Sequence, residues 1–95
     1  MDKRIKSKPS ADEQMERREK FYASIRKGEL SIAEAVIAMR KISRLTQPEF
    51  AKHRGISVQA LRQIEGGTGN PTVETLNKIA SIFTLQVGFV IPPRS

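Results

Sequence analysis

The spacing of apolar residues predicts a chain of short helices. Between residues 31 and 43, apolar residues recur every three or four positions, which places them on one face of a helix. Similar stripes, some of them thin, indicate further helices over 10–27, 46–54, 57–65 and 72–83. The residues expected to form the shared core are Ile32, Ala35, Val36, Met39, Ile42, Phe50, Ala51, Ala60, Leu61, Ile64, Val73, Leu76, Ile79, Ala80 and Phe83.

Helix boundaries are marked by residues that satisfy free backbone groups. Ser31 with Glu34, and Thr46 with Glu49, have the spacing of a capping box, in which hydroxyl and carboxylate each accept a hydrogen bond from a free backbone N–H. Gly55 is expected to end the helix that Thr46 begins, because glycine adopts the left-handed conformation without a Cβ clash. Further helix starts are expected at Ser10, Ser57 and Thr72.

The segments 46–54 and 57–65 form the most informative pair. Two helices joined by a turn of three or four residues that contains glycine make a helix-turn-helix, whose second helix enters the DNA major groove. Glutamine can pair with adenine and arginine with guanine, while valine can pack on a thymine methyl. The polar side of the second helix carries these types at Val58, Gln59, Arg62 and Gln63.

The pattern changes after the last helix. Leu85, Val87, Phe89 and Ile91 alternate with other residues, which predicts a β-strand with one apolar face. No other segment reads as a strand, so we expect the same strand of a second copy to pair with it across a two-fold axis. In the alternative, the last helix continues and the tail packs as an extended arm.

The chain therefore divides into four segments. Residues 1–9 form a basic arm that is expected to be disordered, either touching phosphates or only improving solubility. Residues 10–28 form an N-terminal helical extension that can lie on the domain, on a second subunit or on a partner protein. Residues 29–84 form the helix-turn-helix domain, and residues 85–95 form the terminal strand and tail.

Composition narrows the choice of partner. The formal net charge of +7 and pI of about 10.3 favour a polyanion, and nucleic acid before a membrane. A chain of 95 residues buries only a modest core, so oligomerisation is reasonable. The absence of cysteine excludes disulfides and thiolate metal sites. No apolar run reaches the roughly 18 residues of a membrane span, and the charged N-terminus does not resemble a secretory signal, so we expect a cytoplasmic protein.

Neither of two further features indicates an enzyme. His53 is the only histidine and has no accompanying nucleophile or carboxylate pair, and a lone histidine does not hold a metal. The glycine-rich segment 66–71 lacks the spacing and the strand context of a nucleotide-binding loop. We therefore expect no catalytic activity, no cofactor and no metal.

The segment from Arg40 to Phe83 resembles the Cro/cI, or XRE, family of helix-turn-helix DNA-binding domains, with no break in register. The matching residues are Leu45-Thr46-Gln47, Glu49-Phe50-Ala51, Gly55-Ile56-Ser57, Leu61, Ile64-Glu65, Gly67, Asn70-Pro71-Thr72, Glu74-Thr75-Leu76 and Lys78-Ile79-Ala80. The resemblance implies an all-α, lambda-repressor-like bundle. The N-terminal helix and the short C-terminal β-strand that pairs across a dimer are additions to that fold.

The resemblance also assigns roles to individual positions. It implies that Val58, Gln59, Arg62 and Gln63 contact bases, that Gln47 contacts the DNA backbone and braces the recognition helix, and that Arg40 and Glu65 form a buried ion pair. Arg62 stands where many members have serine, and Val58 replaces a residue that is often polar, so no operator sequence can be transferred. Positive charge and turn geometry around the hairpin suggest further backbone contacts from Arg44, Lys52, Arg54, Ser57, Thr68 and Asn70.

Together these features predict a sequence-specific repressor that binds double-stranded DNA as a homodimer. Its two recognition helices would lie about 34 Å apart on a palindromic operator. The terminal strand resembles that of HipB-type antitoxin repressors, which suggests an antitoxin that represses its own operon and binds a cognate toxin. The alternatives are a phage or plasmid repressor, and a protein-interaction module in which DNA binding is secondary.

Overall fold

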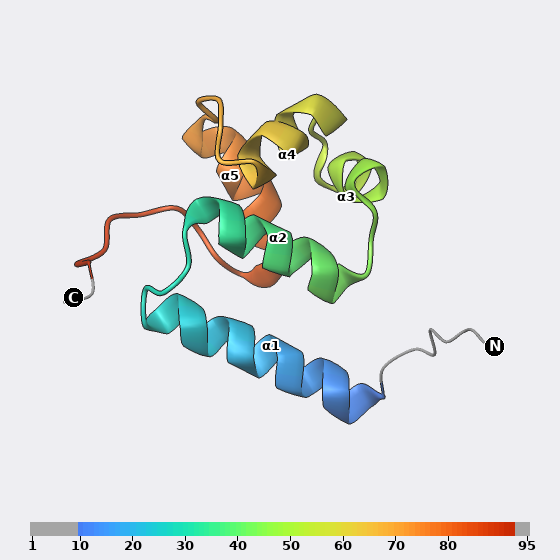
Figure 1. Cartoon of the computed structure of the whole chain (residues 1–95), viewed down its shortest axis with the longest axis vertical. Helices are drawn as coiled ribbons and strands as arrows, with labels where there is room; N and C mark the ends of the chain where they lie inside the picture. The colour runs from blue at the N-terminus through green and yellow to red at the C-terminus, as the bar shows by residue number, and fades with distance from the viewer. Residues whose placement is uncertain (1–9, 93–95) are drawn as a thin grey trace.

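The computed structural model describes residues 10–92, so the expected basic arm at 1–9 and the last three residues lie outside the described range. Within it the chain folds into the helices α1 (Ala11–Arg26), α2 (Ile32–Ser43), α3 (Gln47–Arg54), α4 (Val58–Glu65) and α5 (Val73–Ala80), and the short 3-10 helix η1 (Ser81–Phe83). In Figure 1, α2 lies centrally, with α1 on one side and α3, α4 and α5 on the other. None of the described helices is long and apolar enough to cross a membrane.

The helices begin and end at the residues that the sequence marks for these roles. The Thr46 hydroxyl accepts a hydrogen bond from the Glu49 N–H at 3.3 Å, and the Glu49 carboxylate accepts one from the Thr46 N–H at 2.9 Å. Ser31 and Glu34 form an equivalent box at the start of α2. A third box joins Ser10 to Glu13 at the start of α1, where the sequence predicted only a helix start at Ser10. The local hydrogen bonds thus fix where most elements start.

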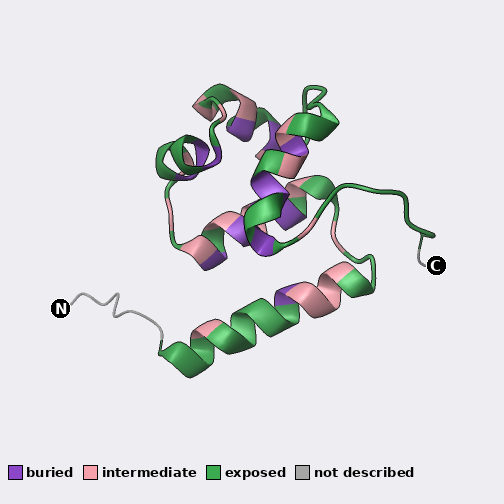
Figure 2. Ribbon diagram, turned by 180° about the vertical axis from the view of Figure 1, so that it is seen from behind, coloured by how far each residue is buried: buried purple, intermediate pink, exposed green. Residues whose placement is uncertain are grey.

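The core lies between α2 and the other helices of the domain. Phe50, Leu61 and Ile79 are fully buried, and Phe83 is 2% exposed. In Figure 2 the buried surfaces of α2 to α5 face one another, while most of α1 is exposed. Burying a large apolar side chain contributes roughly 1.5–3 kcal/mol, so each of these four residues stabilises the core by about that amount. Two residues expected in the core are instead exposed at the first positions of their helices, Ile32 at 54% and Val73 at 59%.

The N-terminal helix α1 lies on the domain, which decides between the three placements that the sequence left open. Phe21 is buried, and the Tyr22 hydroxyl donates a hydrogen bond of 2.8 Å to the carbonyl oxygen of Phe83. The Arg18 guanidinium stacks 5.1 Å from the centre of the Phe83 ring. At the other end of α1, Met15 remains 62% exposed. The helix is therefore attached by its C-terminal half.

The C-terminal segment does not form the expected strand in the single chain. Residues 85–92 have no regular secondary structure, and no strand is present among residues 10–92. The prediction of a strand is therefore not supported, because a strand needs a partner for its backbone groups and the described part of one chain offers none. The last helix does not continue either, since Thr84 adopts the left-handed conformation with a φ of 58°.

This segment instead leaves the domain as an extended arm. Leu85 packs partly against the core, and the Val87 N–H donates a hydrogen bond of 2.8 Å to Asn77 Oδ1 on α5. Beyond that anchor, Phe89 and Ile91 are 106% and 93% exposed. In Figure 1 the arm runs past the turn between α1 and α2 and away from the domain. The chain therefore presents large apolar side chains that it does not bury itself.

Candidate nucleic-acid interface

Helices α3 and α4 form the helix-turn-helix, and α4 presents an exposed polar side. Gly55 joins them with a φ of 72°, and the Ser57 hydroxyl caps α4 by accepting a hydrogen bond of 3.0 Å from the Ala60 N–H. Gln59, Arg62 and Gln63 are exposed. Val58 is half-buried and packs partly against the core. Three of the four predicted base-contact residues are therefore exposed to solvent, whereas only part of the Val58 side chain is exposed.

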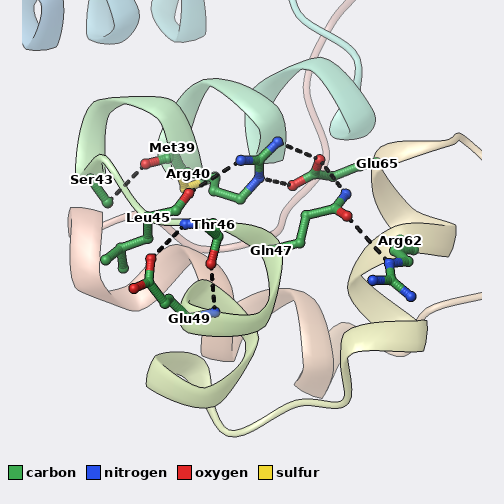
Figure 3. A network of polar contacts seen from close by, with 9 residues as sticks. All are labelled: Met39, Arg40, Ser43, Leu45, Thr46, Gln47, Glu49, Arg62 and Glu65. Atoms are coloured by element: carbon green, nitrogen blue, oxygen red, sulfur yellow. Dashed lines mark hydrogen bonds and ion pairs between the residues drawn. The ribbon is translucent and has the colours of Figure 1, made fainter. Parts of the chain in front are cut away.

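A hydrogen-bonded network connects this surface to α2 (Figure 3). Arg40 donates to both carboxylate oxygens of Glu65, over 2.7 Å from Nε and 3.1 Å from Nη2. Its third nitrogen, Nη1, donates to the carbonyl oxygen of Leu45 at 3.2 Å. The Arg40 side chain is 19% exposed and the Glu65 side chain is 7% exposed. The structure therefore brings together the two residues for which the family resemblance implies an ion pair.

Gln47 extends the network from this pair to the exposed side of α4. Its Nε2 donates to Glu65 Oε1 at 3.0 Å, and its Oε1 accepts a hydrogen bond of 3.3 Å from Arg62 Nε. Because Glu65 takes the amide N–H, the amide oxygen faces Arg62. Nothing in the local sequence indicates the contact between Gln47 and Arg62, since these residues are fifteen positions apart. Gln47 thereby orients one of the predicted base-contact residues.

The network also sets the ionisation of Glu65. Burial by itself would raise the pKa of this carboxyl group, but hydrogen bonds from Arg40 and Gln47, together with the positive charges of Arg40 and Lys41, outweigh it and lower the pKa below its ordinary value. The same contact with Glu65 raises the pKa of Arg40. Both groups are therefore charged at neutral pH, and each balances the other away from bulk water.

The residues predicted to contact the DNA backbone have different surroundings. Those that lie exposed around the hairpin are Arg44, Lys52, Ser57, Thr68 and Asn70. Two of their hydroxyl groups already take part in local hydrogen bonds, because Ser57 caps α4 and Thr68 donates to the Gln63 carbonyl oxygen at 3.3 Å. Exposed cations such as Arg44 and Lys52 are suited to contacts with phosphate oxygens.

Arg54 is placed differently from this expectation. Its side chain is only 6% exposed, and its guanidinium stacks 4.2 Å from the centre of the Phe50 ring. Its Nε and Nη2 have no hydrogen-bond partner among the described residues, and burial lowers its pKa. Residue 54 shares the buried side of α3 with Phe50 and Ala51, so the helix turns it away from the surface. We therefore exclude Arg54 from the candidate interface.

His53 is exposed, and nowhere in residues 10–92 do three or more histidine, aspartate or glutamate side chains gather as metal ligands would.

Comparison with known proteins agrees with this geometry. The family model described as "Helix-turn-helix" matches residues 36–89, which is more than half of the chain and contains α3, α4 and α5. Helix α1 lies outside the match. A protein of Bacillus subtilis (strain 168), named "Uncharacterized HTH-type transcriptional regulator YazB", is 36% identical over 56 residues, which cover 59% of this chain and 81% of that protein. No solved structure matches the chain at a significant level. The chain therefore belongs to the Cro/cI (XRE) family of helix-turn-helix DNA-binding proteins.

Proposed function

We propose that this protein is a sequence-specific transcriptional repressor that binds a palindromic operator as a homodimer. The observation that carries the proposal is the exposed side of α4, where Gln59, Arg62 and Gln63 project from a helix that the hairpin and the Arg40–Glu65 pair hold in place. The similarity to a protein named as a transcriptional regulator and the net charge of +7 support it. The apolar arm supplies the surface for a second copy.

In the proposed complex, α4 lies in the major groove and the flanking cations contact phosphates. Gln59 and Gln63 each read a base edge with an amide, and Arg62 reads guanine with the guanidinium that Gln47 orients. Lys52 and Arg44, with Gln47 and the loop residues Thr68 and Asn70, hold the register on the duplex. Base contacts supply the specificity, and phosphate contacts supply much of the affinity.

The narrower form of the proposal is an antitoxin that represses its own operon. The exposed N-terminal half of α1 lies outside α3 and α4, and it offers a surface for a protein partner while DNA is bound. Co-expression with the product of the neighbouring gene tests this form. If the neighbouring gene encodes a toxin, cells that express it should grow only when this chain is expressed with it. If its product is not toxic, the antitoxin role fails, the repressor proposal stands, and a phage or plasmid repressor becomes the favoured form.

Removing the two glutamine amides should weaken sequence preference, because Arg62 is left as the main polar reader of bases on α4. After a duplex has been selected from a random pool with the wild-type chain, each of Gln59→Ala and Gln63→Ala should weaken binding to it roughly 5- to 150-fold, because a good paired contact is worth about 1–3 kcal/mol. Binding to a scrambled duplex should change little. Fluorescence anisotropy on both duplexes measures the difference. Unchanged binding of the selected duplex by the variant that carries both Gln59→Ala and Gln63→Ala would exclude base readout through α4. It would favour the protein-interaction alternative.

Affinity for the selected duplex should also fall steeply as salt increases. Each phosphate contact releases condensed counterions, so the logarithm of the association constant should fall linearly with the logarithm of salt concentration. Lys52→Ala should make this slope shallower by about 1. Lys20→Ala is the matched control, because Lys20 is also an exposed lysine but lies on α1, beside Glu16 and outside the hairpin. A flat response of the wild-type chain, or equal slopes for the two variants, would contradict the phosphate contacts.

A further inference from the structure

The loop after α4 approaches the side chain of Gln63 closely at Gly69. The loop is tied to α4, because the Thr68 N–H and hydroxyl donate to the Gln63 carbonyl oxygen at 2.9 and 3.3 Å. A Cβ atom added to Gly69 would lie 2.9 Å from Gln63 Oε1, 3.4 Å from its Cβ and 3.5 Å from its Cδ. The side chain of Gln63 therefore occupies space that exists only because residue 69 has no side chain.

We propose that Gly69 determines base specificity, by leaving the space in which the Gln63 amide lies at the exposed side of α4. The inference rests on the proposed function, since it assumes that Gln63 meets DNA. It adds a residue that touches no base itself. Gly69 acts as a positioning residue for the reading amide.

The physical argument starts from what must move when residue 69 gains a side chain. A separation of 2.9 Å between a Cβ and an oxygen is too short to persist, and the residue before Gly69 is held to α4 by the Thr68 hydrogen bonds. The end of the Gln63 side chain is the flexible member of the contact, so it moves. A hollow of about 190 Å³ between α4 and the start of α5, lined by Gln63, Ala60 and Thr72 among others, gives the displaced amide somewhere to go.

Displacement of the amide changes what is presented to DNA. Paired recognition of adenine needs the amide oxygen and nitrogen aligned with N6 and N7 together. An amide that turns into the hollow loses one or both of these bonds. The expected consequence is a changed preference at the base that Gln63 reads, with the remaining positions of the half-site unaffected.

Gly67 provides a matched control within the same loop. Both glycines adopt the left-handed conformation, with φ values of 73° for Gly67 and 76° for Gly69. An added Cβ at Gly67 would meet nothing within 4 Å. Gly67→Ala and Gly69→Ala therefore carry similar backbone strain, while only Gly69→Ala also has to displace the Gln63 side chain.

Two measurements on the full chain test the proposal. In the NMR spectrum without DNA, the side-chain NH₂ signals of Gln63, identified by their loss in Gln63→Ala, should shift in Gly69→Ala and stay in place in Gly67→Ala. In selection from a random DNA pool, Gly69→Ala should alter the preference at the position that Gln63→Ala erases. Gly67→Ala should keep the wild-type motif, and Gln63→Ala/Gly69→Ala should match Gln63→Ala alone.

Distinct outcomes separate this inference from the proposed function. If the wild-type chain selects a motif and Gly69→Ala selects the same one, the inference is overturned and the repressor proposal stands. The inference also fails if the two glycine variants shift the Gln63 signals equally. If the wild-type chain selects no motif, sequence-specific binding fails, and the specificity role of Gly69 fails with it.

Discussion

Replacing Glu65 by alanine is expected to lower the free energy of unfolding by about 3–5 kcal/mol, because it leaves a partly buried cation without its anion. Arg40 would keep only its hydrogen bond to the Leu45 carbonyl oxygen, and the Gln47 amide would lose its acceptor. Small domains are stable by only about 5–15 kcal/mol, so much of the population would unfold on mild heating. Chemical denaturation followed by circular dichroism measures the change.

A surface pair in the same chain provides the control. Lys20 and Glu16 lie 3.8 Å apart on α1 and are 78% and 66% exposed, so Glu16→Ala should cost less than about 1 kcal/mol. Arg40→Met with Glu65→Met should recover much of the stability lost in Glu65→Ala, because no buried charge is left unpaired. If Glu65→Ala were no more damaging than Glu16→Ala, the network would contribute nothing to the fold.

Acid provides a second way to test the same network. The pKa of Glu65 is lowered in the folded chain from an unfolded value of 4.5, so its stabilising contribution is complete above pH 4.5 and is lost as the pH falls through the folded value. Glu13 and Glu49 also have lowered pKa values, through hydrogen bonds at their helix caps. Glu65→Gln removes the ionisable group at residue 65 and keeps Glu13 and Glu49, so its comparison with the wild-type chain isolates the contribution of Glu65. Between pH 5 and pH 3, the wild-type chain should lose more stability than the variant.

The second large effect is expected from the apolar arm. Ile91→Ser should convert a dimer into a monomer of 10.7 kDa and weaken binding to a palindromic duplex on the order of 100-fold, because two linked recognition helices bind more tightly than one. Binding to an isolated half-site should not change. We propose that the arm becomes a strand when it pairs with the arm of a second copy. Phe89→Ser should then behave in the same way, since the alternation places both residues on one face of that strand. Sedimentation velocity and anisotropy measure mass and affinity.

Substitution of Val90 tests whether the arm dimerises through one face of a strand or through non-specific apolar contacts. It is 78% exposed and lies between the two test residues, but alternation places it on the opposite face. Val90→Ser should therefore leave the dimer intact. Equal loss of dimer in Val90→Ser and Ile91→Ser would contradict the strand register, and a wild-type chain that is monomeric at the concentrations that bind DNA would contradict the dimer itself.

The helices and the identity of the hairpin were determined by the sequence itself. Ser31, Thr46 and Ser57 cap helices whose first free N–H groups lie only three residues away, and Gly55 takes a conformation that few other residues adopt without strain. Because these interactions are local, spacing alone predicts them. The apolar stripes fixed which side of each helix enters the core, and therefore which side of α4 stays exposed.

Only the tertiary structure decided how the exposed groups are held. Gln47 meets Arg62 and Tyr22 meets Phe83 because packing brings distant segments together, across 15 and 61 positions. Packing also turns Arg54 inward onto Phe50, although its charge suggested a surface contact. The arm lacks the expected strand because its pairing groups need a partner that a single chain does not contain. Local hydrogen bonds can be predicted from neighbouring residues, whereas these contacts depend on the packing of the whole domain.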